Sequence, residues 1–409
     1  MIKGSSSGEG VGFTAGWFGR SLIMEGVFFM LFFQSRKQKE YIQKLEEAIQ
    51  GFANRSETID ATNGFPFENI KELKAFGYPK LTLAKEYGGH GGTLYDFLLC
   101  QEKIAQYCGP TSLGIGWHVG TVLSLMERKP WEKGVMDELF QEVSAGALVN
   151  TAASEAGTGS PTRGGRPETI AIKKGEQWIL NGRKTFTTLS PVLDIFLVSA
   201  WVPEDELVGT FFVHRDLVGV DIEETWDMIS MQGTGSHDLV LTDVSLPEKY
   251  YVHKSKPGEK RKPEAWLLHI PACYLGIAVA ARNYAVEFAK TYSPNSLPGP
   301  IRDLPNVQRI IGEMELELSE AHHFLYSVAE KWEQHPDERE ALAKQLGAVK
   351  LSVVNKALSI VDKAMRVVGA KSLQRQNPLQ RYYRDVRAGL HNPPMDDATI
   401  TMLAKSALY

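Results

Sequence analysis

The fold of this chain is decided by residues 178–188, which read Trp178-Ile179-Leu180-Asn181-Gly182-Arg183-Lys184-Thr185-Phe186-Thr187-Thr188. Apolar and β-branched residues flank Asn181-Gly182, and an Asn-Gly pair readily takes the positive φ angles of a two-residue type I′ turn. The stretch therefore predicts a β-hairpin that turns at Asn181-Gly182.

A second segment lies just upstream, over residues 150–162, and consists largely of small and hydroxyl residues. The backbone of such a segment can approach a flat or phosphorylated ligand closely. Together the two segments predict one wall of a cofactor site. The alternative interpretation is a surface loop beside an ordinary hairpin.

The composition indicates a folded protein of two or three domains. The chain has 409 residues, of which 43% are hydrophobic and 23% charged. A net charge of -4 gives no reason to expect nucleic-acid binding. Cys100, Cys108 and Cys273 show neither metal-ligand spacing nor a disulfide framework, and Cys100 and Cys108 are predicted to be buried packing residues. A reducing cytoplasm is the expected compartment.

Hydrophobic periodicity divides the chain into four parts. Residues 1–36 form an atypical extension, whose apolar run at 21–33 is too short for a membrane-spanning helix, so no stable membrane insertion is expected. Residues 37–146 have helical spacing, and residues 147–255 have strand spacing with frequent turns, which predicts a small antiparallel β-barrel or sandwich. Residues 256–409 return to helical spacing and predict a four-helix bundle.

The clearest helix of the last part is expected over residues 341–369. One apolar stripe runs along it, and Gly369 suits a C-terminal cap. The stripe consists of Leu342, Leu346, Val349, Val353, Ala357, Ile360, Ala364 and Val367.

The two central segments resemble the motifs of the acyl-CoA dehydrogenase superfamily, in which a small-x-Thr/Ser-Glu-x-x-small-Gly-Ser segment precedes Leu-Asn-Gly-x-Lys-x-aromatic-x-Thr. Further similarities lie at Glu86-Tyr87-Gly88-Gly89, at residues 239–247 and at Arg384-Asp385. The resemblance covers roughly residues 40–409. It implies an α+β multidomain fold with helical, β and helical-bundle domains, assembled as a homotetramer or homodimer.

The resemblance also implies a flavoprotein of fatty acid metabolism. Its cofactor would be FAD, with FMN as the alternative. The expected activity is oxidation of an acyl-CoA or related substrate at a CH–CH bond, with an electron-transfer flavoprotein as redox partner. By position, the residues implied to bind the flavin are Ser154, Gly159, Ser160, Phe186, Thr188, Gln308 and Gly369.

The family's catalytic base has no counterpart at the usual place. Acyl-CoA dehydrogenases remove the α-proton with a glutamate, usually in Tyr-Glu-Gly-Thr, where this chain has Asn392-Pro393-Pro394-Met395. Proline cannot act as a base. Glu264 lies two positions from the alternative glutamate site of isovaleryl-type members and is only a weak candidate.

Residues 384–393 resemble instead the C-terminal motif of the superfamily's flavin-dependent monooxygenases, through Arg-Asp-x-Arg at the start and His-x-Pro at the end. That resemblance implies His391 as an active-site acid or base that stabilises or protonates a peroxyflavin, since imidazole titrates near neutral pH. His118 falls near a second active-site histidine of those enzymes. A flavin reductase would then be the partner.

Three functions therefore stay open from the sequence: a dehydrogenase, a reduced-flavin monooxygenase, and a non-catalytic flavin-binding member of the family. For the monooxygenase, the bundle is expected to place His391 within reach of a flavin ring bordered by Ser154, Phe186 and Thr188. No metal site is predicted.

Overall fold

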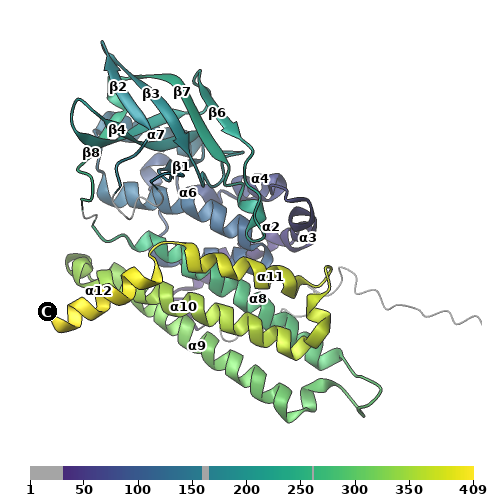
Figure 1. The fold of residues 1–409 in the computed structure, drawn as a ribbon. Coiled ribbons are helices and arrows are strands. Elements are labelled where there is room, and N and C mark those ends of the chain that lie inside the picture. Colours follow the sequence, from purple (N-terminus) through teal and green to yellow (C-terminus); the bar gives the residue numbers. More distant parts are fainter. Residues whose placement is uncertain (1–30, 159–164, 260–261) are drawn as a thin grey trace, which may run out of the picture.

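The computed structural model describes residues 31–158, 165–259 and 262–409. These residues form an N-terminal helical domain, a β-domain and a C-terminal helical bundle, as predicted. Figure 1 shows the β-domain and the bundle at opposite ends of the molecule, with helices of the N-terminal domain between them.

The N-terminal domain is built around two almost fully buried helices joined at Cys108. The first begins with a capping box, in which the Thr93 hydroxyl accepts from the Asp96 N–H and the Asp96 carboxylate accepts from the Thr93 N–H. The second has Pro110 in its first turn, where the missing N–H costs nothing. The helices are α2 (Arg36–Ile49), α3 (Phe52–Thr62), α4 (Phe67–Phe76), α5 (Leu94–Tyr107), α6 (Gly109–Arg128) and α7 (Lys133–Ala145).

The β-domain is one twisted sheet with the strand order β6-β7-β3-β2-β4-β5-β8, and β1 also pairs with β4. Five of the strand pairs are antiparallel, whereas β4 runs parallel to both β1 and β2, so the sheet is mixed rather than purely antiparallel. The strands are β1 (Val149–Ala152), β2 (Ile170–Lys174), β3 (Gln177–Lys184), β4 (Ile195–Val202), β5 (Leu207–His214), β6 (Val220–Glu223), β7 (Asp238–Pro247) and β8 (Tyr251–Ser255).

The predicted turn at Asn181-Gly182 is wrong. β3 runs straight through this pair, with β2 on one side and β7 on the other, and the pairing with β7 shifts register at this point. Gly182 has a φ of 155°, and a Cβ there would lie 2.5 Å from the Thr169 hydroxyl oxygen, so the glycine permits close approach of the backbone at a β-bulge. The actual hairpin turns between β2 and β3 at Gly175, whose φ is 63°.

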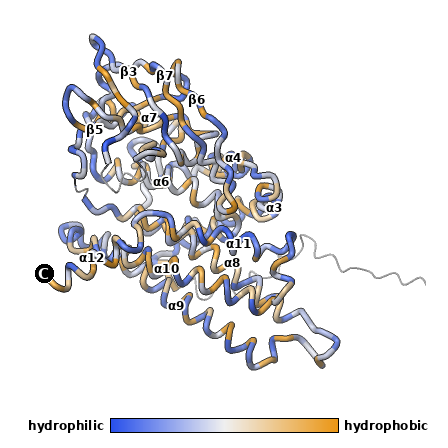
Figure 2. Tube along the Cα trace, viewed as in Figure 1, coloured by the Kyte–Doolittle hydropathy of each residue, from blue (hydrophilic) through white to orange (hydrophobic). Residues whose placement is uncertain are grey.

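The C-terminal bundle contains the predicted long helix, observed from Arg339 to Val368, with Gly369 as its C-cap at a φ of 69°. Figure 2 shows hydrophobic and hydrophilic residues alternating along the bundle helices, as expected for helices with one buried face. The helices are α8 (His269–Thr291), α9 (Pro305–Gln334), α10 (Arg339–Val368), α11 (Pro378–Arg387) and α12 (Asp396–Leu408).

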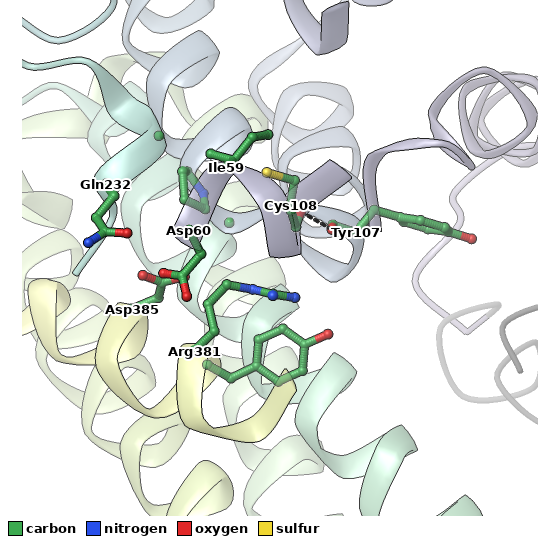
Figure 3. A pocket seen from close by; sticks show the side chains of 12 residues that line it. Ile59, Asp60, Tyr107, Cys108, Gln232, Arg381 and Asp385 are labelled. Atoms are coloured by element: carbon green, nitrogen blue, oxygen red, sulfur yellow. Dashed lines mark hydrogen bonds between the residues drawn. The ribbon is translucent and has the colours of Figure 1, made fainter. Parts of the chain in front are cut away.

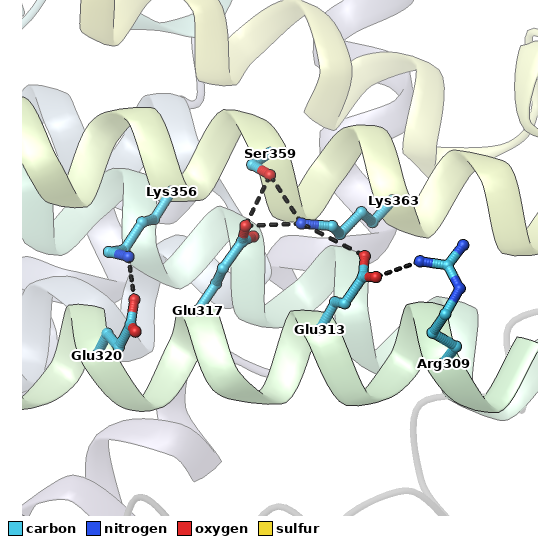
Figure 4. Close-up of polar contacts among 7 residues, drawn as sticks. All are labelled: Arg309, Glu313, Glu317, Glu320, Lys356, Ser359 and Lys363. Carbon is cyan, nitrogen blue, oxygen red and sulfur yellow. Dashed lines mark hydrogen bonds and ion pairs between the residues drawn. The ribbon is translucent and has the colours of Figure 1, made fainter.

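Ion pairs fix the antiparallel register of α9 and α10 on their outer faces. Glu320 pairs with Lys356, and Lys363 contacts Glu317 at 2.6 Å and Glu313 at 3.8 Å (Figure 4). This register brings the start of α9 beside the end of α10.

The most apolar helical segment is Ala265–Thr291, which by length and composition is long enough to cross a membrane. Its most apolar window is 83% buried inside the protein, because this segment is the central helix of the bundle. Of the predicted N-terminal extension, residues 1–30 lie outside the described residues. Phe32 is buried and stacks on His322 and Tyr326 of α9, so this end of the extension packs on the protein.

Candidate functional site

The two sequence segments predicted to form a cofactor wall lie side by side. The Thr185 N–H donates to the Ser154 carbonyl at 2.9 Å. Lys184, which precedes Thr185, and Glu155, which follows Ser154, form an ion pair of 2.5 Å between ammonium and carboxylate. Their side chains are 0% and 1% exposed.

The buried Glu155 carboxylate accepts further hydrogen bonds. Its Oε1 accepts from the Thr169 N–H at 3.0 Å and from the Thr169 hydroxyl at 2.7 Å, and its Oε2 accepts from the Glu168 N–H at 2.5 Å. Burial raises the pKa of Glu155, but the hydrogen bonds from Lys184, Thr169 and Glu168 outweigh it and lower the pKa to about 2. Burial lowers the pKa of Lys184. The pair therefore joins the upstream segment to β3 as a charged anchor.

No role for Glu155 or Lys184 was predicted from the sequence. The available signal was a charged residue, Lys184, at the end of an otherwise apolar strand, together with the glutamate of the upstream motif. Their pairing depends on the sheet, which the sequence alone did not place.

After β3 the chain makes a tight turn that projects an aromatic ring. Phe186 has a φ of 56° and is 58% exposed, and its carbonyl accepts from the Thr188 N–H at 2.9 Å. A bulky residue with positive φ is uncommon and tends to occur at functional sites. Trp226 lies edge-on to this ring, with centroids 5.7 Å apart.

The hydroxyl groups beside Phe186 come from two segments. Thr188 Oγ1 lies 2.9 Å from Ser236 Oγ, and the Thr187 N–H donates to the His237 carbonyl at 3.1 Å. The Thr187 hydroxyl is buried and has no hydrogen-bond partner among the described residues. The exposed Phe186 ring beside the half-buried Thr188 hydroxyl fits a flat ligand that stacks on the ring and forms a hydrogen bond.

The other predicted cofactor residues lie elsewhere. Gly159 and Ser160 lie outside the described residues. Gln308 is exposed in the first turn of α9, and Gly369 is exposed at the end of α10, so the helix register places these two at the same end of the bundle. Figure 1 shows the α8–α9 connection, which leads into this end, on the far side of the bundle from the β-domain. One chain therefore does not bring them together with Phe186.

His391 is exposed at the end of the short helix η10 (Ala388–His391) that follows α11. The backbone before it packs closely against α10 at Gly389, where a Cβ would lie 2.7 Å from Val354 Cγ1. The residue after it, Asn392, accepts from the Tyr274 hydroxyl at 2.6 Å. His391 thus projects from a well-packed turn, and its approach to the cofactor stays a prediction.

His118 has the surroundings of a structural residue. Its side chain is 0% exposed, Nδ1 accepts from the Val149 N–H at 2.9 Å, and Nε2 donates to the Pro79 carbonyl at 3.1 Å. Burial lowers its pKa to about 4. Since both ring nitrogens bond to backbone, this placement does not support the predicted active-site role, and His118 instead ties α6 to β1.

Glu264, the weak candidate for a base, is also engaged. Its Oε1 accepts from the Ser124 hydroxyl at 2.8 Å and from the Arg128 guanidinium. The carboxylate is therefore paired with a cation and directed at α6.

Two acidic residues of α7 and one histidine form the carboxylate–histidine cluster of the described chain. The ligand atoms of Glu138, Glu142 and His214 all lie within 4.8 Å of one another. Glu138 already accepts from Lys249 at 2.7 Å and from the Tyr250 hydroxyl at 2.5 Å, and Glu142 lies 3.0 Å from His214. The two carboxylates and the histidine are thus already engaged in ion pairs and hydrogen bonds with protein groups.

All three domains meet at the start of the predicted Arg-Asp motif in α11. The Arg384 guanidinium donates to both carboxylate oxygens of Asp60 in α3, at 2.9 and 2.6 Å. Asp385 is buried and accepts from the Met231 N–H of the β-domain at 2.7 Å. A small cavity lies beside them, lined also by Gln232 and Arg381 (Figure 3). The cavity has room for about one ordered water molecule.

Asp385 makes stability depend on pH. Burial raises its pKa to about 6, above an unfolded value of about 3.9, so the folded state carries a free-energy penalty that grows as pH rises from about 4 through 6.

Asp385→Asn keeps an acceptor for the Met231 N–H and removes this penalty. The gain in unfolding free energy of the variant over the unmodified chain should be about 2 kcal/mol larger at pH 7.5 than at pH 4.5. Urea unfolding at the two pH values measures it. The exposed Asp221→Asn is the control, and an equal offset at both pH values would contradict the assignment.

Comparison with known proteins covers nearly the whole described chain. Three family models match: the acyl-CoA dehydrogenase N-terminal domain at residues 35–129, the middle domain at 150–244 and the C-terminal domain at 268–392. The chain is 53% identical over 377 residues to YdbM of Bacillus subtilis (strain 168), which carries the provisional name of an acyl-CoA dehydrogenase; the match covers 92% of this chain and 99% of that protein.

Solved structures show the same fold. Butyryl-CoA dehydrogenase from Megasphaera elsdenii superimposes with a TM-score of 0.81 at 20% identity, over 92% of this chain and 99% of its own. TdsC from Paenibacillus sp. A11-2, in a complex with FMN and indole, gives 0.80 at 21% identity, over 91% and 97%.

Proposed function

This chain belongs to the acyl-CoA dehydrogenase family, and from that premise we propose that it oxidises the CH–CH bond of an acyl thioester with a flavin bound between Phe186 and the hydroxyls beside it. The family assignment makes it a flavin-dependent oxidoreductase that uses FAD or FMN. The main observation in support of this site is the exposed Phe186 ring on its strained turn, next to the buried Thr187 hydroxyl, which has no partner in the part of the chain that the structure describes.

The residues of this chain suit the flavin ring. Phe186 offers a stacking face, and Ser154 and Thr188 offer hydrogen-bonding groups at the positions that the family motifs predict. The Glu155–Lys184 pair holds the two segments at a fixed separation. A bound flavin supplies hydride acceptance, which oxidation of a CH–CH bond requires.

Proton removal needs a base other than the usual glutamate, because Pro393 stands at its position. Glu264 is paired with Arg128 and Ser124, and His118 is buried with both ring nitrogens bonded to backbone. We assign the task to His391, whose imidazole nitrogen would take the α-proton. Its exposed position at the end of η10 leaves the ring accessible to a substrate.

A second candidate function is a reduced-flavin monooxygenase. It is favoured by the same missing carboxylate and by the Arg384-Asp385-x-Arg387 and His391-x-Pro393 pattern. His391 would then donate or accept the proton that accompanies transfer of one oxygen atom to the substrate. The electron partner follows from the reaction: an electron-transfer flavoprotein for the dehydrogenase, or a flavin reductase for the monooxygenase.

The remote position of Gln308 and Gly369 supports an oligomer. If these residues hold the end of FAD that is remote from its flavin ring, that FAD must belong to a neighbouring subunit. Within one chain they lie on the side of the bundle away from the β-domain and Phe186. We therefore propose a homodimer or homotetramer, and the cytoplasmic location expected from the sequence stays a prediction.

Anaerobic mixing of the flavin-loaded protein with butyryl-CoA tests the primary function. We expect the absorbance of oxidised flavin to fall, because a hydride leaves the thioester. If no acyl thioester in a panel of chain lengths causes this loss, the dehydrogenase proposal fails. Incorporation of oxygen-18 from dioxygen into an added organic substrate, with chemically reduced flavin, would then establish the monooxygenase.

A further inference from the structure

The segment that joins β6 to β7, residues 224–237, links the proposed flavin site to α11. On one side its Trp226 ring lies edge-on to Phe186. On the other side its Met231 N–H donates to Oδ1 of the buried Asp385 at 2.7 Å. The segment is therefore held between the β-domain and the C-terminal bundle, and its polar groups have fixed places.

Met231 presents a backbone carbonyl that collects several donors. Its φ is 52°, and its side chain is buried. The carbonyl oxygen accepts from the Thr234 N–H at 3.1 Å, from Trp226 Nε1 at 3.3 Å and from the Thr234 hydroxyl at 2.9 Å. A carbonyl oxygen can only accept, so the hydroxyl hydrogen of Thr234 must point at Met231.

A chain of three hydroxyl groups starts at this carbonyl. Thr234 Oγ1 lies 2.9 Å from Ser236 Oγ, which lies 2.9 Å from Thr188 Oγ1, and both distances are those of O–H···O hydrogen bonds. Each hydroxyl has a single hydrogen. Because Thr234 donates to Met231, Ser236 must donate to Thr234, and Thr188 must then donate to Ser236. The carbonyl thus sets the direction of every hydrogen bond in the chain.

The direction of the chain decides what Thr188 offers to a ligand. Its hydrogen is directed at Ser236, and Oγ1 has no other hydrogen-bond partner in the part of the chain that the structure describes. Its methyl group Cγ2 faces α6, since a Cβ at Gly114 would lie 4.0 Å from it. Thr188 is half-buried beside the exposed Phe186 ring. A ring stacked on Phe186 therefore meets an oxygen that accepts a hydrogen bond and does not donate one.

We propose that Thr234 and Ser236 are positioning residues that fix Thr188 as a hydrogen-bond acceptor, so that the site selects the reduced flavin over the oxidised flavin. Reduction turns a bare ring nitrogen of a flavin into an N–H group, which an acceptor binds, whereas a bare nitrogen opposite an acceptor gains no hydrogen bond. This inference rests on the proposed function only in taking Phe186 and Thr188 as the flavin site.

The selection has a consequence for the redox chemistry. Binding and reduction of a flavin form one thermodynamic cycle, so tighter binding of the reduced form makes the bound flavin easier to reduce. One hydrogen bond between neutral groups accounts for a factor of about three to ten in affinity. This factor is the size of effect expected from the hydroxyl chain.

The ratio of two dissociation constants, that of oxidised FMN divided by that of chemically reduced FMN, measures the selection. Anaerobic equilibrium dialysis of the flavin-free protein gives both constants. Thr188→Val removes the acceptor and should lower the ratio by about threefold to tenfold. Thr188→Ser keeps the hydroxyl and should keep the ratio.

Thr234→Val tests the direction of the chain without changing the hydroxyl that faces the ligand. The Met231 carbonyl keeps its bonds from the Thr234 N–H and from Trp226. Ser236 loses its acceptor and turns its hydrogen to Thr188, which then directs its own hydrogen at the ligand. The ratio should fall at least as far as in Thr188→Val. Ser236→Ala also frees the Thr188 hydrogen and gives a second measurement should Thr234→Val fail to fold.

Ser190→Ala is the matched control. The Ser190 hydroxyl is buried and donates to the Gly235 carbonyl at 2.9 Å, outside the chain of three hydroxyls, so its loss should lower the melting temperature and leave the ratio unchanged. A ratio that Thr234→Val and Ser236→Ala both leave unchanged would overturn the proposal, and so would a protein that binds neither form of FMN. If the ratio shifts as expected while butyryl-CoA fails to reduce the flavin, only the proposed oxidation fails.

Discussion

Lys184→Met should destabilise the protein by about 3–5 kcal/mol, because it leaves the buried Glu155 carboxylate without its cation. Urea unfolding followed by circular dichroism measures the change. The hydrogen bonds from Thr169 and Glu168 stay in place but do not neutralise the charge. The double variant Glu155→Gln and Lys184→Met should recover part of the loss, since an amide carries no charge to neutralise.

The control for this experiment is an exposed ion pair between β3 and β6. Arg183 pairs with Glu223 on the exposed surface, and Glu223→Gln should cost less than about 1 kcal/mol. Equal costs for the buried and exposed pairs would contradict the anchoring role. The pH dependence has a definite sign: with a folded pKa of about 2, Glu155 stabilises the fold above its unfolded pKa of about 4.3, and this contribution is lost as pH falls toward 2.

His391→Ala should lower kcat by roughly 10²–10⁴-fold, the usual contribution of a positioned acid or base. The thioester assay measures this if butyryl-CoA reduces the flavin, and the oxygen-incorporation assay measures it otherwise. Flavin affinity and melting temperature should change little, because the side chain is exposed and the packing of this turn comes from Gly389 and Asn392.

His335→Ala, which removes an exposed histidine at the end of α9, is the matched control for the loss of an imidazole. If His391→Ala and His335→Ala had the same small effect, proton transfer would have to be assigned to another residue. A loss of activity accompanied by loss of flavin would instead indicate that His391 supports the cofactor site.

Much of this structure could be predicted from local sequence patterns. The stripe from Leu342 to Val367 predicted α10 to within a few residues, and Gly369 caps it as expected, because helix periodicity and capping involve only neighbours three or four residues apart. The family motifs likewise identified the segments around Ser154 and Phe186, which lie side by side in the structure.

The predicted hairpin turn was wrong because a local signal had more than one structural solution. Asn181-Gly182 is a strong turn signal, yet it forms a bulge inside β3, because β7 and Thr169 on either side leave no room for a side chain at Gly182. The role of His118 stays a prediction, which its enclosure between the backbones of Pro79 and Val149 does not support.

The sequence by itself determined the succession of helical, β and helical domains, the amphipathic faces of the helices and the family membership, since these depend on short-range periodicity and on motifs of a few residues. Only the tertiary structure decided that Glu155 meets Lys184 and that Asp385 is buried at the junction of three domains. Burial and pairing depend on contacts between residues tens to hundreds of positions apart, and local patterns do not encode those distances.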